Sequence, residues 1–309
     1  TAISQLLLWT KTVKYVDFQK VQFAQIKKHF WPIIRLFVPM IALSIYHFMD
    51  KTMLDLLSTE AEVGYYYAAD KIIYIPLGLI TAIGTVMLPR ISSIVDESKE
   101  KTEKLLSKST ELSICMSCAV GFGIAAIARV FVPLFFGEGY EKCVNLLVLF
   151  VPVLFVKSLS NVVNQQYLIP AKCDNQYTLA VTGGAIVNLI CNGLLIPQLG
   201  SVGATLGTLM AELSVLIISA HCAKKEIRFF RMFSRYSYYL LLGLIMFVAV
   251  RFFDSYTHIE QSFIRLILMI MIGGGVYSLL CLTVWLKVKE KSVFGSILIS
   301  LSKKGAIRK

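Results

Sequence analysis

Long apolar stretches alternate along this chain with short connections, and every second connection is rich in lysine and arginine. Each stretch is long enough to cross the roughly 30 Å hydrocarbon core of a bilayer as a helix. The eight stretches lie at 31–50, 62–88, 112–136, 143–168, 176–196, 201–222, 236–252 and 263–286. The 56% of hydrophobic residues and the mean hydropathy of +0.69 exceed what a soluble domain keeps in water. The sequence therefore predicts an all-α fold, a polytopic membrane helical bundle.

The basic residues predict how these spans are oriented. Of the 31 lysines and arginines, 23 lie in alternate connections, at 10–30, 90–108, 172 and 224–235 and after residue 286. Connections with an excess of Lys and Arg stay on the cytoplasmic side. The formal net charge of +12 thus gathers beside span ends, where anionic lipid headgroups are the expected partners. We therefore expect a multi-pass membrane protein that does not bind nucleic acid.

The connections predicted to face outward leave no room for a folded catalytic domain. They comprise 51–61, a few residues around 136–142, the turn at 197–200, and 253–262. The chain has no Gly-rich phosphate loop, no H-E-x-x-H motif and no nucleophile elbow. We expect no catalytic residue, no metal site and no cofactor, and a protein that is not an enzyme.

The basic connection at 90–111 mixes five basic and five acidic residues with a stripe of apolar ones. An amphipathic helix that lies on the cytoplasmic membrane surface fits this pattern. A solvated helical linker with ion pairs at i,i+4 fits it equally well. The sequence leaves both interpretations open.

Four predicted spans carry polar side chains along one face, which is costly in hydrocarbon unless that face meets a cavity or a partner. In the first of these stripes the spacing is i, i+3, i+4 and i+7, so the four side chains share one helix face. The stripes are Tyr67, Asp70, Lys71 and Tyr74; Lys157, Asn161, Asn164 and Gln165; Thr205, Thr208 and Glu212; and Asn188 with Asn192. Four such faces turned inward would enclose a wet, hydrogen-bonding cavity.

The charged groups within the spans also have structural explanations. Asp70 and Lys71 either serve transport or pair with neighbouring spans, for example with Asp50 and Lys51. Glu212 either couples an ion or is held by hydroxyl and amide groups across the bundle.

Arg35 and Lys157 differ in their predicted depth. Arg35 lies about one turn inside the cytoplasmic edge of its span, so its long side chain can snorkel to the interface. Lys157 lies in the middle of its span and cannot easily do so, which favours a position in the cavity.

Several short segments follow one another in a characteristic order between about residue 20 and residue 286. They are Asp50–Met53, Val63–Ile72, Leu88–Ser92, Phe136–Tyr140 and Leu195–Gly200, followed by Gly203–Thr205 and Glu212. Their order and spacing resemble the C-terminal half of a Wzx-type polysaccharide flippase. That family moves lipid-linked oligosaccharides and belongs to the MATE-like MOP exporter superfamily.

The resemblance implies a division of the chain into three parts. Residues 1–30 would be the end of a preceding transmembrane helix and a cytoplasmic linker, within a longer protein. Residues 31–222 would form the second six-helix bundle of a MATE-like fold. Residues 223–309 would add two transmembrane helices and a basic cytoplasmic tail.

The resemblance also implies a function in the bacterial cytoplasmic membrane. Proteins of this family translocate undecaprenyl-pyrophosphate-linked oligosaccharide repeat units by alternating access, for capsule, O-antigen or cell-wall polysaccharide. The implied partners are this substrate, membrane lipids, a polysaccharide polymerase and glycosyltransferases, with H+ or Na+ as the coupling ion.

Within that function the chemistry of the substrate suggests roles for the polar residues. Charged donors bind a pyrophosphate strongly, and the candidates are Arg35, Lys71 and Lys157. Amide and phenol groups match sugar hydroxyls, and the candidates are Asn161, Asn164, Gln165, Tyr67 and Tyr74. Buried carboxyl groups can take up a proton, which makes Asp70 and Glu212 the candidates for ion coupling.

Two other functions stay open. The chain can belong to a MATE-like exporter of drugs or cations, or to a membrane scaffold of the polysaccharide synthesis machinery that transports nothing. The basic character of the buried charges favours an anionic substrate over a cation. Restored surface polysaccharide in a flippase-deficient strain would separate the first interpretation from the other two.

Overall fold

The computed structural model describes residues 48–257 and 262–288, together with residues 9, 12, 30, 33, 34 and 37. Its described residues are almost all helical, and none of them forms a strand. Residues Thr1–Ile41 and Ala42–Lys309 form two separate compact units. The helices α3 to α10 all belong to the second unit, and their arrangement positions the candidate site.

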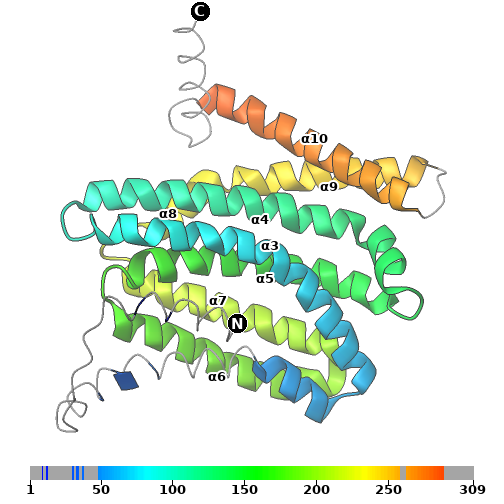
Figure 1. Ribbon diagram of the computed structural model, residues 1–309, viewed down its shortest axis with the longest axis horizontal. Coiled ribbons are helices and arrows are strands. Elements are labelled where there is room, and N and C mark those ends of the chain that lie inside the picture. Colours follow the sequence, from blue (N-terminus) through cyan, green and yellow to red (C-terminus); the bar gives the residue numbers. More distant parts are fainter. Residues whose placement is uncertain are drawn as a thin grey trace, which may run out of the picture. The chain divides into compact units, whose positions relative to one another are not determined.

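A helical segment at 48–57 precedes the labelled helices of Figure 1. These are α3 (Glu60–Ser92), α4 (Lys99–Phe136), α5 (Glu141–Val163), the π-helix η2 (Asn164–Leu168), α6 (Asp174–Leu199), α7 (Ser201–Ala223), α8 (Phe229–Tyr236), α9 (Tyr238–Tyr256) and α10 (Phe263–Val288). Seven stretches within the described residues are long and apolar enough to cross a membrane, with η2 counted with α5 and α8 with α9. The predicted all-α membrane bundle is confirmed, with seven of the eight spans. The span predicted at 31–50 lies outside the described residues except for 48–50.

Helix α5 lies at the centre of the bundle. It packs against α3, α4 and α7, while α6 packs mainly against α7, and α9 and α10 pack against α4. An apolar window in Glu141–Leu168 is 61% buried, against 22% for the corresponding windows in α3 and α10. The outer helices therefore present most of their apolar surface outward, as lipid-facing helices do, and the polar side chains of α5 meet protein.

Helix α4 is longer than its predicted span because the charged segment before it is part of the same helix. Ser98 caps the N-terminus by accepting a hydrogen bond from the Lys101 amide. Thr102 and Leu106 are buried, so this extension packs against protein on one face. Of the two interpretations of 90–111, a helix lying flat on the membrane is wrong for 99–111, which continues the span.

Small residues let α6 and α7 approach closely. A Cβ atom added at Gly203 would lie 2.4 Å from the carbonyl oxygen of Leu195, and one at Gly207 would lie 2.0 Å from the Asn192 side-chain oxygen. Close backbone approach of this kind is how membrane helices gain packing energy without a hydrophobic driving force. The contact fixes the amides of α6 beside the hydroxyls of α7.

A carboxylate ties three helices together at the end of the bundle predicted to face outward. Glu62 of α3 accepts hydrogen bonds from the backbone amide of Ser201, at 2.8 Å, and from its hydroxyl. The Lys142 ammonium of α5 donates to the other oxygen of Glu62. The carboxylate therefore satisfies one of the N-terminal backbone donors of α7, the Ser201 amide, next to the turn at Gly200 with φ +57°.

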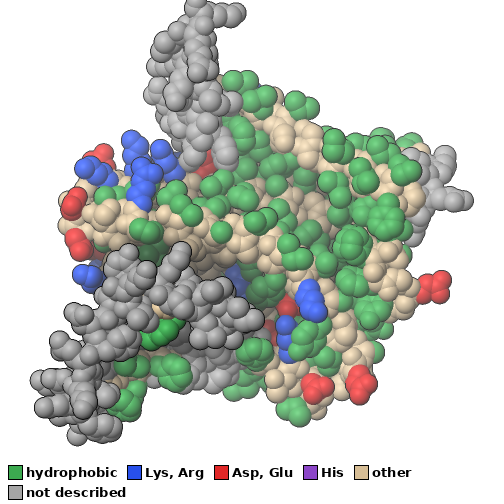
Figure 2. Space-filling view, viewed as in Figure 1, with side chains coloured by type: hydrophobic (Ala, Val, Ile, Leu, Met, Phe, Trp, Pro, Cys, Tyr) green, Lys and Arg blue, Asp and Glu red, His purple; other side chains and the backbone are tan. Residues whose placement is uncertain are grey.

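Charged side chains concentrate at the ends of the helices. In Figure 2 hydrophobic side chains cover much of the visible face, and lysines, arginines and carboxylates cluster at the end where α3 stops and α4 begins. The same end carries α8, which buries Phe229, Met232 and Tyr236 and exposes Arg231 and Arg235. A short amphipathic helix with arginines on its polar face suits the membrane interface.

We expect Gly203→Ala to lower the stability of the protein by about 1 to 3 kcal/mol, the usual cost of overpacking. The added methyl group would meet backbone atoms, which cannot rotate away. Thermal unfolding in detergent measures the effect. Gly123→Ala is the matched control, because a Cβ atom added there would meet no neighbouring atom within 4 Å. Equal melting temperatures for both variants would contradict the close contact.

The orientation of the spans predicts which loops a membrane-impermeant maleimide reaches from outside the cell. Glu138→Cys, in the turn between α4 and α5, should react in intact cells. Lys225→Cys, beyond the end of α7, should react only after the membrane is permeabilised. Both variants need a background without the partly exposed native cysteines. If Lys225→Cys is labelled in intact cells, the predicted orientation of the spans is wrong.

Candidate functional site

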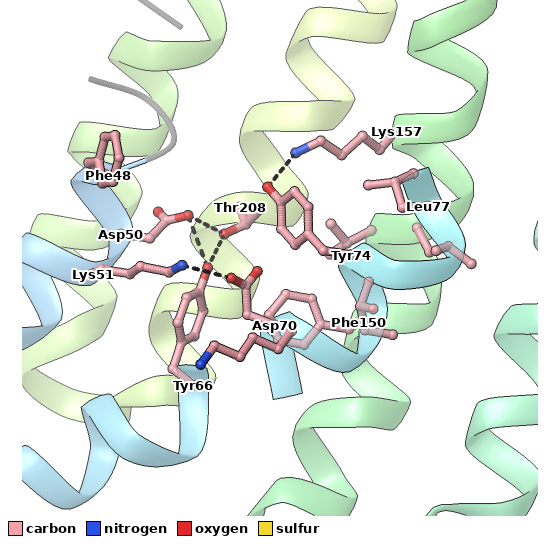
Figure 3. Close-up of a pocket in the computed structure, with 14 residues that line it drawn as sticks. Phe48, Asp50, Lys51, Tyr66, Asp70, Tyr74, Leu77, Phe150, Lys157 and Thr208 are labelled. Carbon is pink, nitrogen blue, oxygen red and sulfur yellow. Dashed lines mark hydrogen bonds and ion pairs between the residues drawn. The ribbon is translucent and has the colours of Figure 1, made fainter. Parts of the chain in front are cut away.

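A cavity of about 460 Å³ opens between the 48–57 segment and helices α3, α5 and α7. Its volume lies within the roughly 300 to 1,000 Å³ typical of ligand sites. Aromatic and aliphatic side chains form part of the wall, and charged groups project into the rest (Figure 3). The lining residues are Phe48, Asp50, Lys51, Tyr66, Asp70, Lys71, Ile73, Tyr74, Leu77, Phe150, Val153, Leu154, Lys157 and Thr208.

Lys51 and Asp70 form an ion pair across the cavity. Figure 3 shows the two side chains pointing toward each other, and the Lys51 Nζ atom lies 3.0 Å from Asp70 Oδ2. The same ammonium lies 4.3 Å from the centroid of the Tyr67 ring, within reach of a cation–π interaction. Asp70 is 6% exposed, so the pair stabilises a charge that would otherwise be costly to bury.

A second ion pair lies deeper along α5. Lys157 Nζ is 3.0 Å from Glu212 Oε1 of α7, and it donates a hydrogen bond of 3.1 Å to the Tyr74 hydroxyl of α3. Lys157 lies 16 residues after Glu141, or about 24 Å along the helix. One lysine on α5 thus joins three helices.

Asp50 is the centre of a buried hydrogen-bond network. Its Oδ1 atom accepts from the amides of Asn188 and Asn192, at 2.8 and 2.7 Å. Its Oδ2 atom accepts from the hydroxyls of Tyr66 and Thr208, at 3.0 and 2.9 Å. Four neutral donors from α3, α6 and α7 therefore hold one carboxylate, as a buried charge requires.

Lys71 differs from the other two lysines of the cavity. It lines the cavity but is itself exposed, and no carboxylate in the described part of the chain lies within 4.0 Å of its ammonium. It is the cavity cation most accessible to an incoming anion.

The structure brings together six of the residues predicted from sequence. Asp70, Lys71, Tyr74 and Lys157 line the cavity. Glu212 pairs with Lys157, and Tyr67 lies under Lys51.

The predicted amides of α5 and η2 lie elsewhere. Asn164 accepts a 2.7 Å hydrogen bond from the Ser219 hydroxyl of α7, and Asn161 packs against Gly84 of α3. Neither of them, nor Gln165, is among the residues that line the cavity, so their binding of sugar stays a prediction. Arg35 lies outside the described residues.

Asp50 and Lys51 have a larger role than the sequence predicts. The sequence suggests them only as alternative partners of Asp70 and Lys71, yet Lys51 is the actual partner of Asp70 and Asp50 anchors α6 and α7. The feature of the sequence that points to these two residues is a pair of adjacent charges at the end of a predicted span. Its importance cannot be judged from sequence, because α6 and α7 lie more than 130 residues away in the chain.

The site contains no cluster typical of a metal centre. Among the described residues, no group of three or more His, Cys, Asp or Glu side chains is placed to hold a metal ion. Asp50 is surrounded by oxygen-bearing side chains, but in this structure its neighbours present hydrogen-bond donors to it.

Comparison with known proteins gives one family. The model of the lipid II flippase MurJ family matches residues 1–272. A putative O-antigen transporter of Escherichia coli is 26% identical over 176 residues, which cover 57% of this chain and 42% of the relative. A probable low-salt glycan biosynthesis flippase of Haloferax volcanii is 22% identical over 241 residues, which cover 77% and 50%. The chain thus spans about half the length of these relatives.

A solved structure shows the same fold. The inward closed conformation of lipid II flippase MurJ superposes with a TM-score of 0.71 at 17% identity, over 92% of this chain and 60% of that one. With seven apolar spans, the chain is a multi-pass protein of the cytoplasmic membrane. The family model covers most of its length, and the chain therefore belongs to the MurJ family of lipid flippases.

Proposed function

We propose that the protein translocates a lipid-linked oligosaccharide across the cytoplasmic membrane for the synthesis of a surface or cell-wall polysaccharide. The observation that carries this proposal is a cavity with three lysines inside an apolar helical bundle of the flippase family. The proposed substrate is an oligosaccharide repeat unit on undecaprenyl pyrophosphate, destined for capsule, O-antigen or cell wall.

The cavity suits the diphosphate group of such a substrate. Lys51, Lys71 and Lys157 present ammonium groups on flexible stems, each with three donors for phosphate oxygens. Tyr74 adds a hydroxyl that already contacts Lys157. The apolar remainder of the wall excludes water, which strengthens every charged hydrogen bond made inside.

An exporter of organic cations is the less favoured alternative. Such a substrate would need a carboxylate that faces the cavity and is held neither by a cation nor by hydrogen-bond donors of the protein. Asp70 and Glu212 each pair with a lysine, and four neutral donors already surround Asp50. Lys71 lines the cavity with no carboxylate partner in the described part of the chain, which favours an anionic ligand.

Alternating access is the proposed mechanism for the whole protein. In it the cavity would open to each side of the membrane in turn as two helical bundles rock against each other. Pro76 interrupts the hydrogen-bond ladder of α3 between the cavity residues Tyr74 and Leu77, and a helix bends most easily at such a point. The proposed partners are the glycosyltransferases that complete the repeat unit and the polymerase that consumes it.

Coupling to H+ or Na+ through Asp70 and Glu212 is part of the proposal. Both carboxylates are buried and both hold a cavity lysine. A change in the protonation of either would change the charge offered to the substrate.

Lys157→Ala is expected to lower polymer export about tenfold or more while the protein stays in the membrane. A charged hydrogen bond contributes about 1.5 to 3 kcal/mol, and each 1.4 kcal/mol is a factor of ten. Surface polysaccharide in a flippase-deficient strain measures export. Lys104→Ala, on the exposed cytoplasmic end of α4, is the control.

A second variant separates binding from simple charge pairing. Lys157→Met with Glu212→Met removes the ion pair without leaving a buried charge unpaired. If Lys157 binds substrate, the double variant stays defective. Wild-type export by the double variant would reduce the pair to a structural role.

The Lys51–Asp70 pair should tolerate exchange of its charges. Lys51→Asp and Asp70→Lys alone each leave a buried charge without its partner and should lower the amount of folded protein. Combined, they should restore most of it, which a double-mutant cycle on melting temperatures measures. Asp70→Lys with Lys71→Asp should give no such rescue. Rescue by that second combination would assign Asp70 to Lys71 instead.

A further inference from the structure

Among the residues that the structure describes, the charges in and around the cavity cancel. Three lysines line it, and three carboxylates of this part of the chain lie beside them, namely Asp50, Asp70 and Glu212. A cavity with no net charge has little long-range attraction for a polyanion. Binding of a diphosphate therefore requires some of these lysines to be released from their carboxylates.

Release of a lysine from either ion pair requires only that its own side chain moves. Lys51 and Lys157 each contact a carboxylate at 3.0 Å, and each ammonium also lies over an aromatic ring, that of Tyr67 and that of the cavity residue Tyr74 respectively. Their side chains are 24% and 18% exposed, against 8% for Asp70 and 5% for Glu212. The ammonium groups can thus turn to a ligand while the carboxylates stay behind in the protein.

A carboxylate left behind cannot remain ionised at low cost. Asp70 is faced by Lys51 from the 48–57 segment, by Lys157 from α5 and by the like charge of Asp50. Glu212 is faced by Lys157. The α6 side chains near these groups, Asn188 and Asn192, are neutral and already bonded to Asp50. Once the lysines turn away, protonation lowers the cost of keeping these carboxyl groups buried.

We propose that the cavity binds the diphosphate of its substrate by exchange. Phosphate oxygens replace Asp70 and Glu212 as the partners of Lys51 and Lys157, and each released carboxylate takes up a proton. Lys71, which is exposed and has no carboxylate partner in the described part of the chain, makes the first contact. The inference rests on the proposed function and names how substrate and proton are linked at the same site.

Calorimetric titration of the purified protein with farnesyl diphosphate tests the exchange. Repeating the titration at one pH in buffers of different ionisation enthalpy gives the number of protons taken up per ligand bound. The diphosphate can itself gain or lose a proton, so the decisive quantity is the difference between the wild type and Asp70→Asn/Glu212→Gln. The amides keep the shape of the carboxyl groups but cannot titrate.

We expect the wild type to take up between one and two protons more per ligand than the double variant. The double variant should bind farnesyl diphosphate about tenfold more tightly, because its lysines no longer need to be released. Asp70→Asn alone should show an intermediate uptake, and this single variant serves if the double variant does not fold. Glu138→Gln, in the exposed turn after α4, should match the wild type.

The outcomes distinguish the exchange from the function on which it rests. Equal proton uptake by wild type and double variant, with both binding, would overturn the exchange and leave the flippase proposal standing. Absence of farnesyl diphosphate binding in the wild type, together with normal export by Lys157→Ala, would overturn both. Inorganic diphosphate in place of the prenyl ligand should show the same difference in protons, since the headgroup alone makes the exchange. If inorganic diphosphate binds without this difference in proton uptake, the result would also count against the proposal.

Discussion

The cost of placing an ionised group inside an apolar bundle governs the structure around the cavity. The buried carboxylates beside the cavity meet either a lysine or a set of neutral donors, as Asp70 meets Lys51 and Asp50 meets four amide and hydroxyl groups. These contacts join the 48–57 segment to α3, α6 and α7. Burial thus turns a few polar side chains into the connections that set how the helices lie.

The central position of α5 follows from the same constraint. Its Lys157 must find an anion within the bundle, and the contact with Glu212 of α7 and Tyr74 of α3 supplies partners on both sides. The helices that carry few polar groups, such as α10, can instead lie at the edge of the bundle with most of their surface exposed. Apolar packing fills the space around these contacts, but it does not select the partner of a charge.

A lysine held by a carboxylate serves both stability and function in this arrangement. The pair lowers the cost of burial while the cavity is empty of anions, and it keeps a cation within reach of one. A permanently unpaired lysine at the same depth would destabilise the bundle, whereas an apolar residue would leave nothing for a phosphate to bind. The proposed exchange of partners is therefore a consequence of burying cations that must still be available.

The sequence by itself determined the membrane fold, because the length of each apolar stretch and the placement of lysines and arginines are local properties of the chain. It also identified Asp70, Lys71, Tyr74 and Lys157, since helical spacing puts polar residues on one face. It did not determine which charges meet. The pairing of Lys51 with Asp70, the place of Asp50 among α6 and α7, and the distance of Asn164 from the cavity lining were decided by tertiary structure. Periodicity gives the direction of a side chain on its own helix, but only the packing of helices distant in sequence brings its partner to it.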